Sequence, residues 1–117
     1  MNGPRRAPPI YEIGGFHLDS GRRQLRSPQG ELATLQANVF DILQFLVEHY
    51  GQLVEKSALM KAAWPNVIVE EGNLSQGIFL LRRALGERAG EDRFIMTVPG
   101  RGFRFVAPVA LMAPRIV

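Results

Sequence analysis

The side chains with the clearest chemistry in this sequence are amide and guanidinium groups in its last third. The amide of Gln76 both donates and accepts hydrogen bonds, and Arg82 and Arg83 follow about two helical turns later. Arg101 stands between two glycines in a segment that is otherwise rich in apolar residues. These groups bind polar edges and anionic oxygens, but none of them is a nucleophile or a general base. They indicate a binding surface rather than a catalytic centre.

Catalytic and metal-binding chemistry has little support in the sequence. There is no cysteine, and the two histidines, His17 and His49, lie far apart, which excludes disulfide frameworks and thiolate zinc sites. No histidine is paired with a carboxylate in a catalytic pattern, and no glycine-rich loop precedes a helix to hold phosphate. We therefore expect neither an enzyme, nor a cofactor, nor a bound metal.

Length and composition fit one small globular domain of 117 residues, of which 46% are hydrophobic. The chain has 14 basic and 11 acidic side chains, a net charge of +3, and a pI near 10.0. This modest excess is compatible with a polyanionic partner without proving one. No apolar run is long enough to cross a bilayer, and the first residues lack the apolar centre of a signal peptide. A cytoplasmic location is expected.

The two ends of the chain differ from its middle. Residues 1–9 contain three prolines and two arginines and are expected to form a flexible arm. Short apolar-alternating pieces then follow, separated by turn residues, which predicts a small antiparallel sheet. Its four strands are expected at 11–13, 16–18, 24–26 and 31–33. Residues 108–117 show no clear period and are expected to be a tail or the start of a linker, which leaves 10–107 as the folded domain.

Two helices are expected between residues 35 and 64. From Leu35 to Tyr50 the apolar positions, including Tyr50, keep a 3.6-residue rhythm that is typical of a core helix. A shorter helix over 56–64 ends before Pro65, which lacks an N–H and clashes with the preceding turn. Residues 65–72 then form a connecting loop.

The third expected helix leads directly into a β-hairpin. Asn73 has the side chain of an N-cap residue, and Gly86 ends the helix. A 100° step per residue turns one set of side chains toward the core and another set away from it. The inward set is Leu74, Ile78, Leu81 and Leu85; the outward set is Gln76, Phe79, Leu80 and Arg83, with Ser75 and Arg82 at one flank. Residues 94–106 are two apolar runs joined by Pro-Gly-Arg-Gly, which predicts a hairpin with a cationic tip. A helix followed by such a hairpin is the layout of a winged helix that binds DNA.

The outward side chains are those that a major groove would meet. Gln76 can pair bidentately with adenine, and Phe79 can meet a thymine methyl group. Arg101 at the hairpin tip suits a minor groove. Guanidinium, ammonium and indole N–H groups suit phosphate oxygens, which position a protein without reading sequence. We expect base contacts from Asn73, Ser75, Gln76 and Phe79, phosphate contacts from Lys56, Trp64, Arg82 and Arg83, and a minor-groove contact from Arg101.

Six motifs also carry a family resemblance in the right order. They are Phe40-Asp-Ile-Leu43, Gly51-Gln-Leu-Val-Glu-Lys-Ser-Ala-Leu59, Trp64-Pro65, Val69-Glu-Glu-Gly-Asn-Leu74, Leu81-Arg-Arg-Ala-Leu-Gly86 and Thr97-Val-Pro-Gly-Arg-Gly-Phe-Arg-Phe105. Over about residues 10–106 the chain resembles the effector domain of OmpR/PhoB-type bacterial transcriptional regulators. The resemblance implies an α+β fold, a winged helix-turn-helix with an N-terminal four-stranded antiparallel sheet, three helices and a C-terminal β-hairpin wing. At most nine residues precede this domain, so the chain looks more like the CadC/ToxR-like branch, in which any sensor lies beyond Val117.

The resemblance also implies a function, namely sequence-specific binding of double-stranded DNA to regulate transcription. Helix 73–86 would lie in the major groove and the wing, 94–106, at the minor groove. Four residues fall at positions where the family contacts the DNA backbone: Lys56, Trp64, Arg82 and Thr97. The loop 65–72 is similar to a transactivation loop that contacts RNA polymerase, with Asn66, Glu70 and Glu71 as candidates. A second copy bound head-to-tail on the DNA is implied as well.

An alternative function stays open because of the outward apolar residues. Phe79 and Leu80 lie outside a complete inner stripe, at positions where the family often has arginine. Leu80 would pack on the wing or on a partner subunit. With the modest net charge, this pair also fits a winged helix that binds proteins without DNA. Gly77 in mid-helix costs about 1 kcal/mol relative to alanine, which indicates either the close approach of a neighbouring backbone or DNA, or drift.

Overall fold

The computed structural model describes residues 8–112, which form two compact units. The first unit consists of the described residues up to Ala33 together with those from Pro108 onward, and the second is Thr34–Ala107. The sequence predicted a single folded domain over 10–107, whereas the described chain continues past that boundary within the first unit. The arm expected over 1–9 lies almost wholly outside the described residues.

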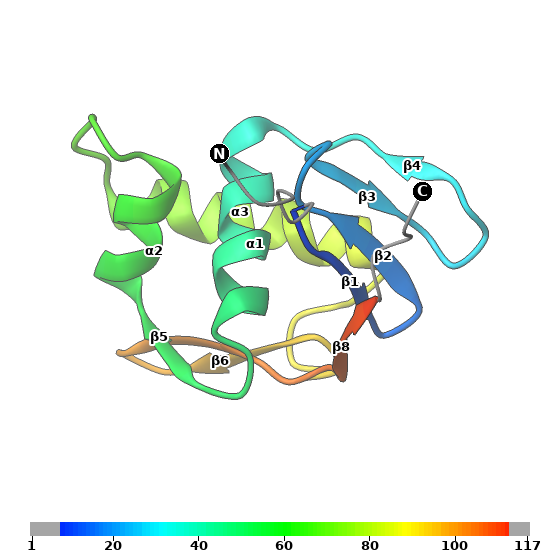
Figure 1. Cartoon of the computed structure of the whole chain (residues 1–117). Helices are drawn as coiled ribbons and strands as arrows, with labels where there is room; N and C mark the ends of the chain where they lie inside the picture. The colour runs from blue at the N-terminus through cyan, green and yellow to red at the C-terminus, as the bar shows by residue number, and fades with distance from the viewer. Residues whose placement is uncertain (1–7, 113–117) are drawn as a thin grey trace, which may run out of the picture. The chain divides into compact units, whose positions relative to one another are not determined.

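The first unit is a five-stranded antiparallel sheet (Figure 1). Its strands are β1 (Ile10–Ile13), β2 (Phe16–Asp19), β3 (Gln24–Arg26), β4 (Leu32–Ala33) and β8 (Val109–Met112), in the spatial order β4-β3-β2-β1-β8. Because successive side chains of a strand point to opposite faces, one face of the sheet can be buried. The fully or almost fully buried side chains on it are Ile13, Phe16, Leu18 and Leu25.

The fifth strand, β8, corrects the prediction of a tail or linker for residues 109–112, whereas residues 113–117 lie outside the described part of the chain. It pairs antiparallel with β1 in a register that joins Ile10 to Met112 and Ile13 to Val109. Its sequence, Val-Ala-Leu-Met, shows no alternation of apolar and polar residues. The signal for a half-buried strand was therefore absent, although the backbone pairing is regular.

The second unit combines three helices with a small antiparallel sheet. The elements are α1 (Ala37–Glu48), β5 (Leu53–Glu55), α2 (Lys56–Ala63), α3 (Glu71–Leu85), β6 (Ile95–Val98) and β7 (Gly102–Phe105). The three helices contact one another, and the sheet, in the order β5-β7-β6, contacts α1 through β7 and α2 through β5 (Figure 1). The α+β fold class predicted from the sequence, with an N-terminal sheet, three helices and a C-terminal hairpin, is confirmed.

Helix boundaries differ from the sequence predictions by one or two residues at most ends. α1 runs from Ala37 to Glu48 and not to Tyr50, whose side chain is 55% exposed, so its place on the apolar stripe was wrong. The backbone leaves helical geometry at His49, where φ is −117°, and the stripe cannot continue past that point. α2 ends at Ala63, one residue before the expected end.

The start of α3 also corrects the sequence analysis. The N-cap is Glu70, and Asn73 lies three residues inside the helix. The backbone N–H of Glu70 donates to Asn73 Oδ1 at 3.2 Å, and the backbone N–H of Asn73 donates to the Glu70 carbonyl at 2.9 Å. Asn73 therefore closes the first turn from within, as the third residue of a capping box does. The helix ends at Gly86, as predicted.

Candidate nucleic-acid interface

The outer face of α3 presents the predicted base-contact residues together with Arg83. Ser75, Gln76 and Arg83 are exposed, and Phe79 is 57% exposed. The predicted inward stripe is buried: Leu74, Ile78, Leu81 and Leu85. Asn73 is exposed as well, but its amide oxygen accepts the capping hydrogen bond described above. Four polar side chains and one aromatic ring are therefore exposed on this face.

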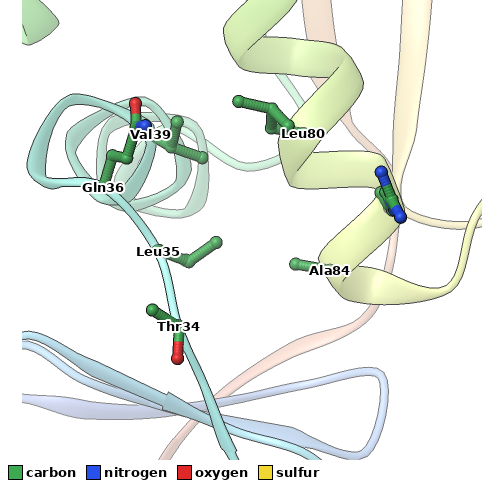
Figure 2. Close-up of a pocket in the computed structure, with 7 residues that line it drawn as sticks. Thr34, Leu35, Gln36, Val39, Leu80 and Ala84 are labelled. Carbon is green, nitrogen blue, oxygen red and sulfur yellow. The ribbon is translucent and has the colours of Figure 1, made fainter.

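Leu80 does not belong to this outer face. It is half-buried and lines a hollow between the start of α1 and the second half of α3. Figure 2 shows Leu80 pointing from α3 toward Val39 on α1, with Leu35 and Thr34 on the segment that precedes α1. The prediction that Leu80 lies on the outward face was wrong, because its side chain points toward α1 and not toward the wing; packing on a partner subunit stays a prediction. The 100° step does place Leu80 away from the stripe of Leu74, Ile78, Leu81 and Leu85, but α1 packs against that side of α3.

Phe79 instead lines a groove between α3 and the wing. The residues around this groove are Ser75, Ile78, Phe79, Arg82, Arg83, Glu87, Arg88, Ala89, Thr97 and Phe103. The aromatic ring of Phe103 is buried, whereas Arg83 and Arg88 are exposed. The groove therefore combines apolar lining with two exposed cations. Arg88 was missed by the sequence analysis because it lies in a loop, where no periodicity marks its direction.

Arg82 is directed into the fold, with only 9% of its surface exposed. Its Nη2 donates to the Ile95 carbonyl at 3.0 Å and to Thr97 Oγ1 at 3.0 Å. Its Nε lies 3.6 Å from Glu87 Oε1, an ion pair without a hydrogen bond. Arg82 thus ties α3 to β6, a positioning role that the sequence did not predict. Thr97, its partner, is exposed.

Glu87 completes this link between α3 and the wing and was also missed. Its carboxylate is buried and accepts hydrogen bonds from the backbone N–H groups of Phe94 and Ile95, the latter at 3.1 Å. A buried carboxylate needs such partners to offset its lost hydration. Glu87 therefore fixes the entry into β6 against the end of α3. The sequence signal was an acid directly after Gly86, which is indistinguishable from a surface loop residue.

The base of the wing depends on a very close approach of two strands. Gly102 on β7 pairs with Glu55 on β5, and a Cβ placed at Gly102 would lie 2.0 Å from the carbonyl oxygen of Val54. No side chain fits there, because the obstacle is backbone. The backbone N–H of Lys56 also donates to the Arg101 carbonyl at 3.1 Å. The turn of the wing is therefore fixed next to the start of α2.

Arg101 at the wing tip is bound to an acidic neighbour. Its Nη2 donates to Glu55 Oε1 at 2.8 Å, and the two side chains are 60% and 49% exposed. The hydrogen bond from Arg101 holds the pKa of the Glu55 carboxyl below its ordinary value, and the carboxylate raises the pKa of Arg101. The pair is fully ionised at neutral pH. The sequence placed Arg101 at the tip but gave no sign of its partner, 46 residues away.

The remaining predicted backbone contacts lie around α2. Lys56 is half-buried, and its Nζ lies 3.3 Å from Glu71 Oε2, which joins the first turns of α2 and α3. Trp64 is half-buried beside Gly77. A Cβ at Gly77 would lie 2.7 Å from Ile42 Cδ1, so this glycine accommodates α1 rather than DNA.

The loop between α2 and α3 is open to solvent. Asn66 and Glu70 are exposed, as expected for residues that meet a partner. Val67 and Ile68, which the sequence analysis did not single out, are exposed too, Ile68 completely. The loop therefore presents two β-branched apolar side chains together with its polar ones.

Other classes of site find no support in the part of the chain that the structure describes. Between residues 8 and 112, no group of three or more side chains is arranged to ligate a metal ion. None of the helices in this range has the length and apolar character required to cross a membrane.

Known proteins with similar sequences are transcriptional regulators. HilA of Salmonella typhimurium is 37% identical over 75 residues, which is 64% of this chain and 13% of that protein. CadC of Escherichia coli K12 is 28% identical over 102 residues, or 86% of this chain and 20% of that protein. The chain thus spans a fifth or less of the length of these two relatives.

Solved structures agree with the sequence relatives. The DNA-binding domain of E. coli CadC superposes with a TM-score of 0.77 at 26% identity, covering 92% of this chain and all of that domain. The RstA DNA-binding domain of Klebsiella pneumoniae, in complex with the RstA box, gives a TM-score of 0.72 at 29% identity and covers 83% of this chain and 96% of that one. The family model described as "Transcriptional regulatory protein, C terminal" matches residues 30–105. The chain therefore belongs to this family, the winged-helix domains of OmpR/PhoB type.

Proposed function

We propose that this chain is the DNA-binding domain of a bacterial transcriptional regulator and that it reads duplex DNA with α3 in the major groove. The observation that carries the proposal is the outer face of α3, where Ser75, Gln76 and Arg83 are exposed beside a groove with a cationic rim. The relative RstA was solved in complex with the RstA box. As a DNA-binding domain of a transcription factor, the chain has no enzymatic role.

Base recognition is assigned to the outer face of α3. Gln76 is the principal reader, because its amide matches the donor and acceptor pair of adenine. Ser75 and Asn73 flank it, and Phe79 contacts a thymine methyl group. The capping bond uses the Asn73 oxygen and leaves its amide N–H₂ to donate.

Phosphate contacts surround this face. Lys56, Trp64, Arg83 and Thr97 remain candidates, and we add Arg88 because it is exposed on the rim of the groove. We leave Arg82 out, since its Nη2 is shared between Ile95 and Thr97 inside the fold. Arg101 is assigned to the minor groove beside the α3 site.

Two further partners are part of the proposal. The exposed loop with Asn66, Val67, Ile68 and Glu70, together with Glu71 at the start of α3, would contact RNA polymerase, and a second copy would bind head-to-tail on adjacent DNA. Because its ligand is chromosomal DNA, we assign the domain to the cytoplasm.

A protein-binding function is the second candidate, favoured by two observations. The unit Thr34–Ala107 contains equal numbers of basic and acidic side chains, and Phe79 is an exposed aromatic ring in a groove. Such a surface would suit an apolar partner whose binding is nearly insensitive to salt.

Selection of bound duplexes from a random-sequence pool tests the primary proposal, followed by titration of the selected duplex at several salt concentrations. We expect a defined motif and a linear fall of log affinity with log salt, with a slope of about −0.9 for each phosphate contacted. A direct repeat in the motif would support head-to-tail pairing. An unenriched pool together with weak, salt-insensitive binding would favour the protein-binding function instead.

A further inference from the structure

We propose that Glu55 lowers the affinity of this domain for DNA, because its carboxylate binds the guanidinium of Arg101 that would otherwise be available to DNA. The proposal rests on the proposed function, since it concerns the affinity of the same interface for duplex DNA. The residue belongs to β5, an element that the sequence analysis did not anticipate and that has no assigned contact with DNA.

The contact between Arg101 and Glu55 is one in which a DNA phosphate can replace the carboxylate. Arg101 Nη2 lies 2.8 Å from Glu55 Oε1, within the range of a charge-assisted hydrogen bond. Both side chains are about half exposed or more, so water, salt and an incoming phosphate can reach the pair. Exposed pairs of this kind are held weakly and open readily. A phosphate can therefore replace the carboxylate at the guanidinium.

The pair is not needed to hold the wing in place. The backbone of the tip is already fixed by the β5–β7 ladder, by the bond from Lys56 N–H to the Arg101 carbonyl at 3.1 Å, and by the bond from Arg101 N–H to the Val98 carbonyl at 3.0 Å. Glu55 is also the residue before α2, yet its side chain makes no capping bond to that helix. The consequence of its carboxylate is therefore mainly electrostatic.

Glu55 should weaken binding in two ways. The carboxylate competes with a phosphate or the minor groove for Nη2 of Arg101, and it remains close to a negatively charged backbone. Because Glu55 neutralises Arg101 in the free protein, the pair displaces fewer condensed counterions from the DNA on binding than an unpaired arginine would. Removing the charge of Glu55 should tighten binding and steepen its dependence on salt.

The test is a double-mutant cycle with E55Q and R101Q, on a mixed-sequence duplex and on a selected duplex, at several salt concentrations. We expect E55Q to tighten binding about three- to fivefold at low salt and to steepen the salt slope by up to about one unit. R101Q should weaken binding, and in the R101Q background E55Q should have no effect beyond that of the control. The control is E48Q, which removes one exposed negative charge at the end of α1. Thermal unfolding should be unchanged in E55Q.

Each other outcome would contradict the proposal that Glu55 lowers DNA affinity by competing for Arg101. Unchanged or weaker binding by E55Q, while R101Q weakens binding, would show that Glu55 is neutral or helps to present the arginine. Equal tightening by E55Q with and without Arg101 would reveal general repulsion rather than competition for one cation. If the wild type binds but R101Q has no effect, the wing tip does not contact the DNA; the inference about Glu55 is then wrong, whereas the proposed function stands. If the wild type itself shows no salt-dependent binding to either duplex, the proposed function fails and takes the inference with it.

Discussion

The outer face of α3 and the wing present their charged groups in opposite ways. Arg83 on α3 is exposed, and no acidic partner for it occurs among residues 8–112. Arg101 on the wing is exposed too, but it is bound to Glu55. An exposed arginine is therefore not by itself a measure of binding strength. What distinguishes the two sites is the acid that the fold brings beside one of them.

The two regions are also held in place by different means. α3 is anchored by a stripe of buried apolar residues of its own, among them Leu74 and Leu81. The wing depends on residues from elsewhere in the chain: Glu87 at the entry to β6 and the backbone of Val54 beside Gly102. Substitutions of the buried anchors should lower stability in either region, whereas a substitution on the exposed face of α3 should alter recognition alone.

The largest effect is expected for Gly102→Ala. The new methyl group would lie 2.0 Å from the Val54 carbonyl oxygen, so β5 and β7 must separate, and the free energy of unfolding should fall by about 4 kcal/mol or more. Urea denaturation measures this loss. Gly72→Ala is the matched control, because nothing lies within 4 Å of a Cβ there, and its stability should stay within about 1 kcal/mol of the wild type. Equal stability of the two variants would mean that the wing does not rest on β5.

For the helix, Leu81→Ala should lower the free energy of unfolding by about 2 to 5 kcal/mol, because a fully buried side chain is lost and a cavity remains. Phe79→Ala, on the exposed face, should change it by less than about 1 kcal/mol. The same denaturation experiment compares both. If Phe79→Ala proved as destabilising as Leu81→Ala, Phe79 would be a packing residue and the assignment of the outer face would be lost.

Glu87→Ala should cost about 3 kcal/mol of stability, because two backbone N–H groups lose their acceptor and Arg82 loses its acidic neighbour. Amide hydrogen exchange should rise at Phe94 and Ile95 before it rises in α3. Glu91→Ala is the control: its pair with Arg93 is solvent-exposed at 3.8 Å and should contribute less than about 1 kcal/mol. Unaltered exchange at Phe94 and Ile95 would contradict the role of Glu87 as the anchor of the wing.

The smallest change in folding, and a selective change in recognition, is expected for Gln76→Ala. Affinity for a selected duplex should fall by about 1 to 3 kcal/mol while affinity for random duplexes stays nearly constant, because base contacts specify and phosphate contacts only position. Titration on both duplexes measures the difference. Gln52→Ala removes the same amide from an exposed turn and should alter neither affinity. An equal loss on both duplexes would remove Gln76 from the set of base readers.

The parts of this molecule that the sequence predicted are those specified locally. The stripe from Leu74 to Leu85 follows from a 3.6-residue period, and the hairpin follows from the Pro-Gly-Arg-Gly turn, so both were predicted from short windows. The start of α3 shows the limit of such signals. Asn73 is a good N-cap by residue type, but Glu70 takes that position and uses Asn73 as its partner.

The parts that were not predicted depend on pairings across long stretches of chain. β8 has no pattern of its own and becomes a strand only through β1, about a hundred residues earlier. Leu80 is half-buried because α1 lies beside it, and Glu55 meets Arg101 only once β5 and β7 have paired. The exposure of the outward side chains on α3 was therefore largely predictable, whereas the acids beside the arginines were not.

The pairing of β1 with β8 gives the first sheet a particular mechanical weakness. Ile10 and Met112 are partners in the ladder, so the chain enters β1 and leaves β8 at the same end of the pair. A pull applied between these two residues would load the backbone hydrogen bonds one after another, as in opening a zipper, instead of sharing the load among all of them. β8 would peel from β1 at low force, and the remaining four strands, β1 to β4, would stay joined.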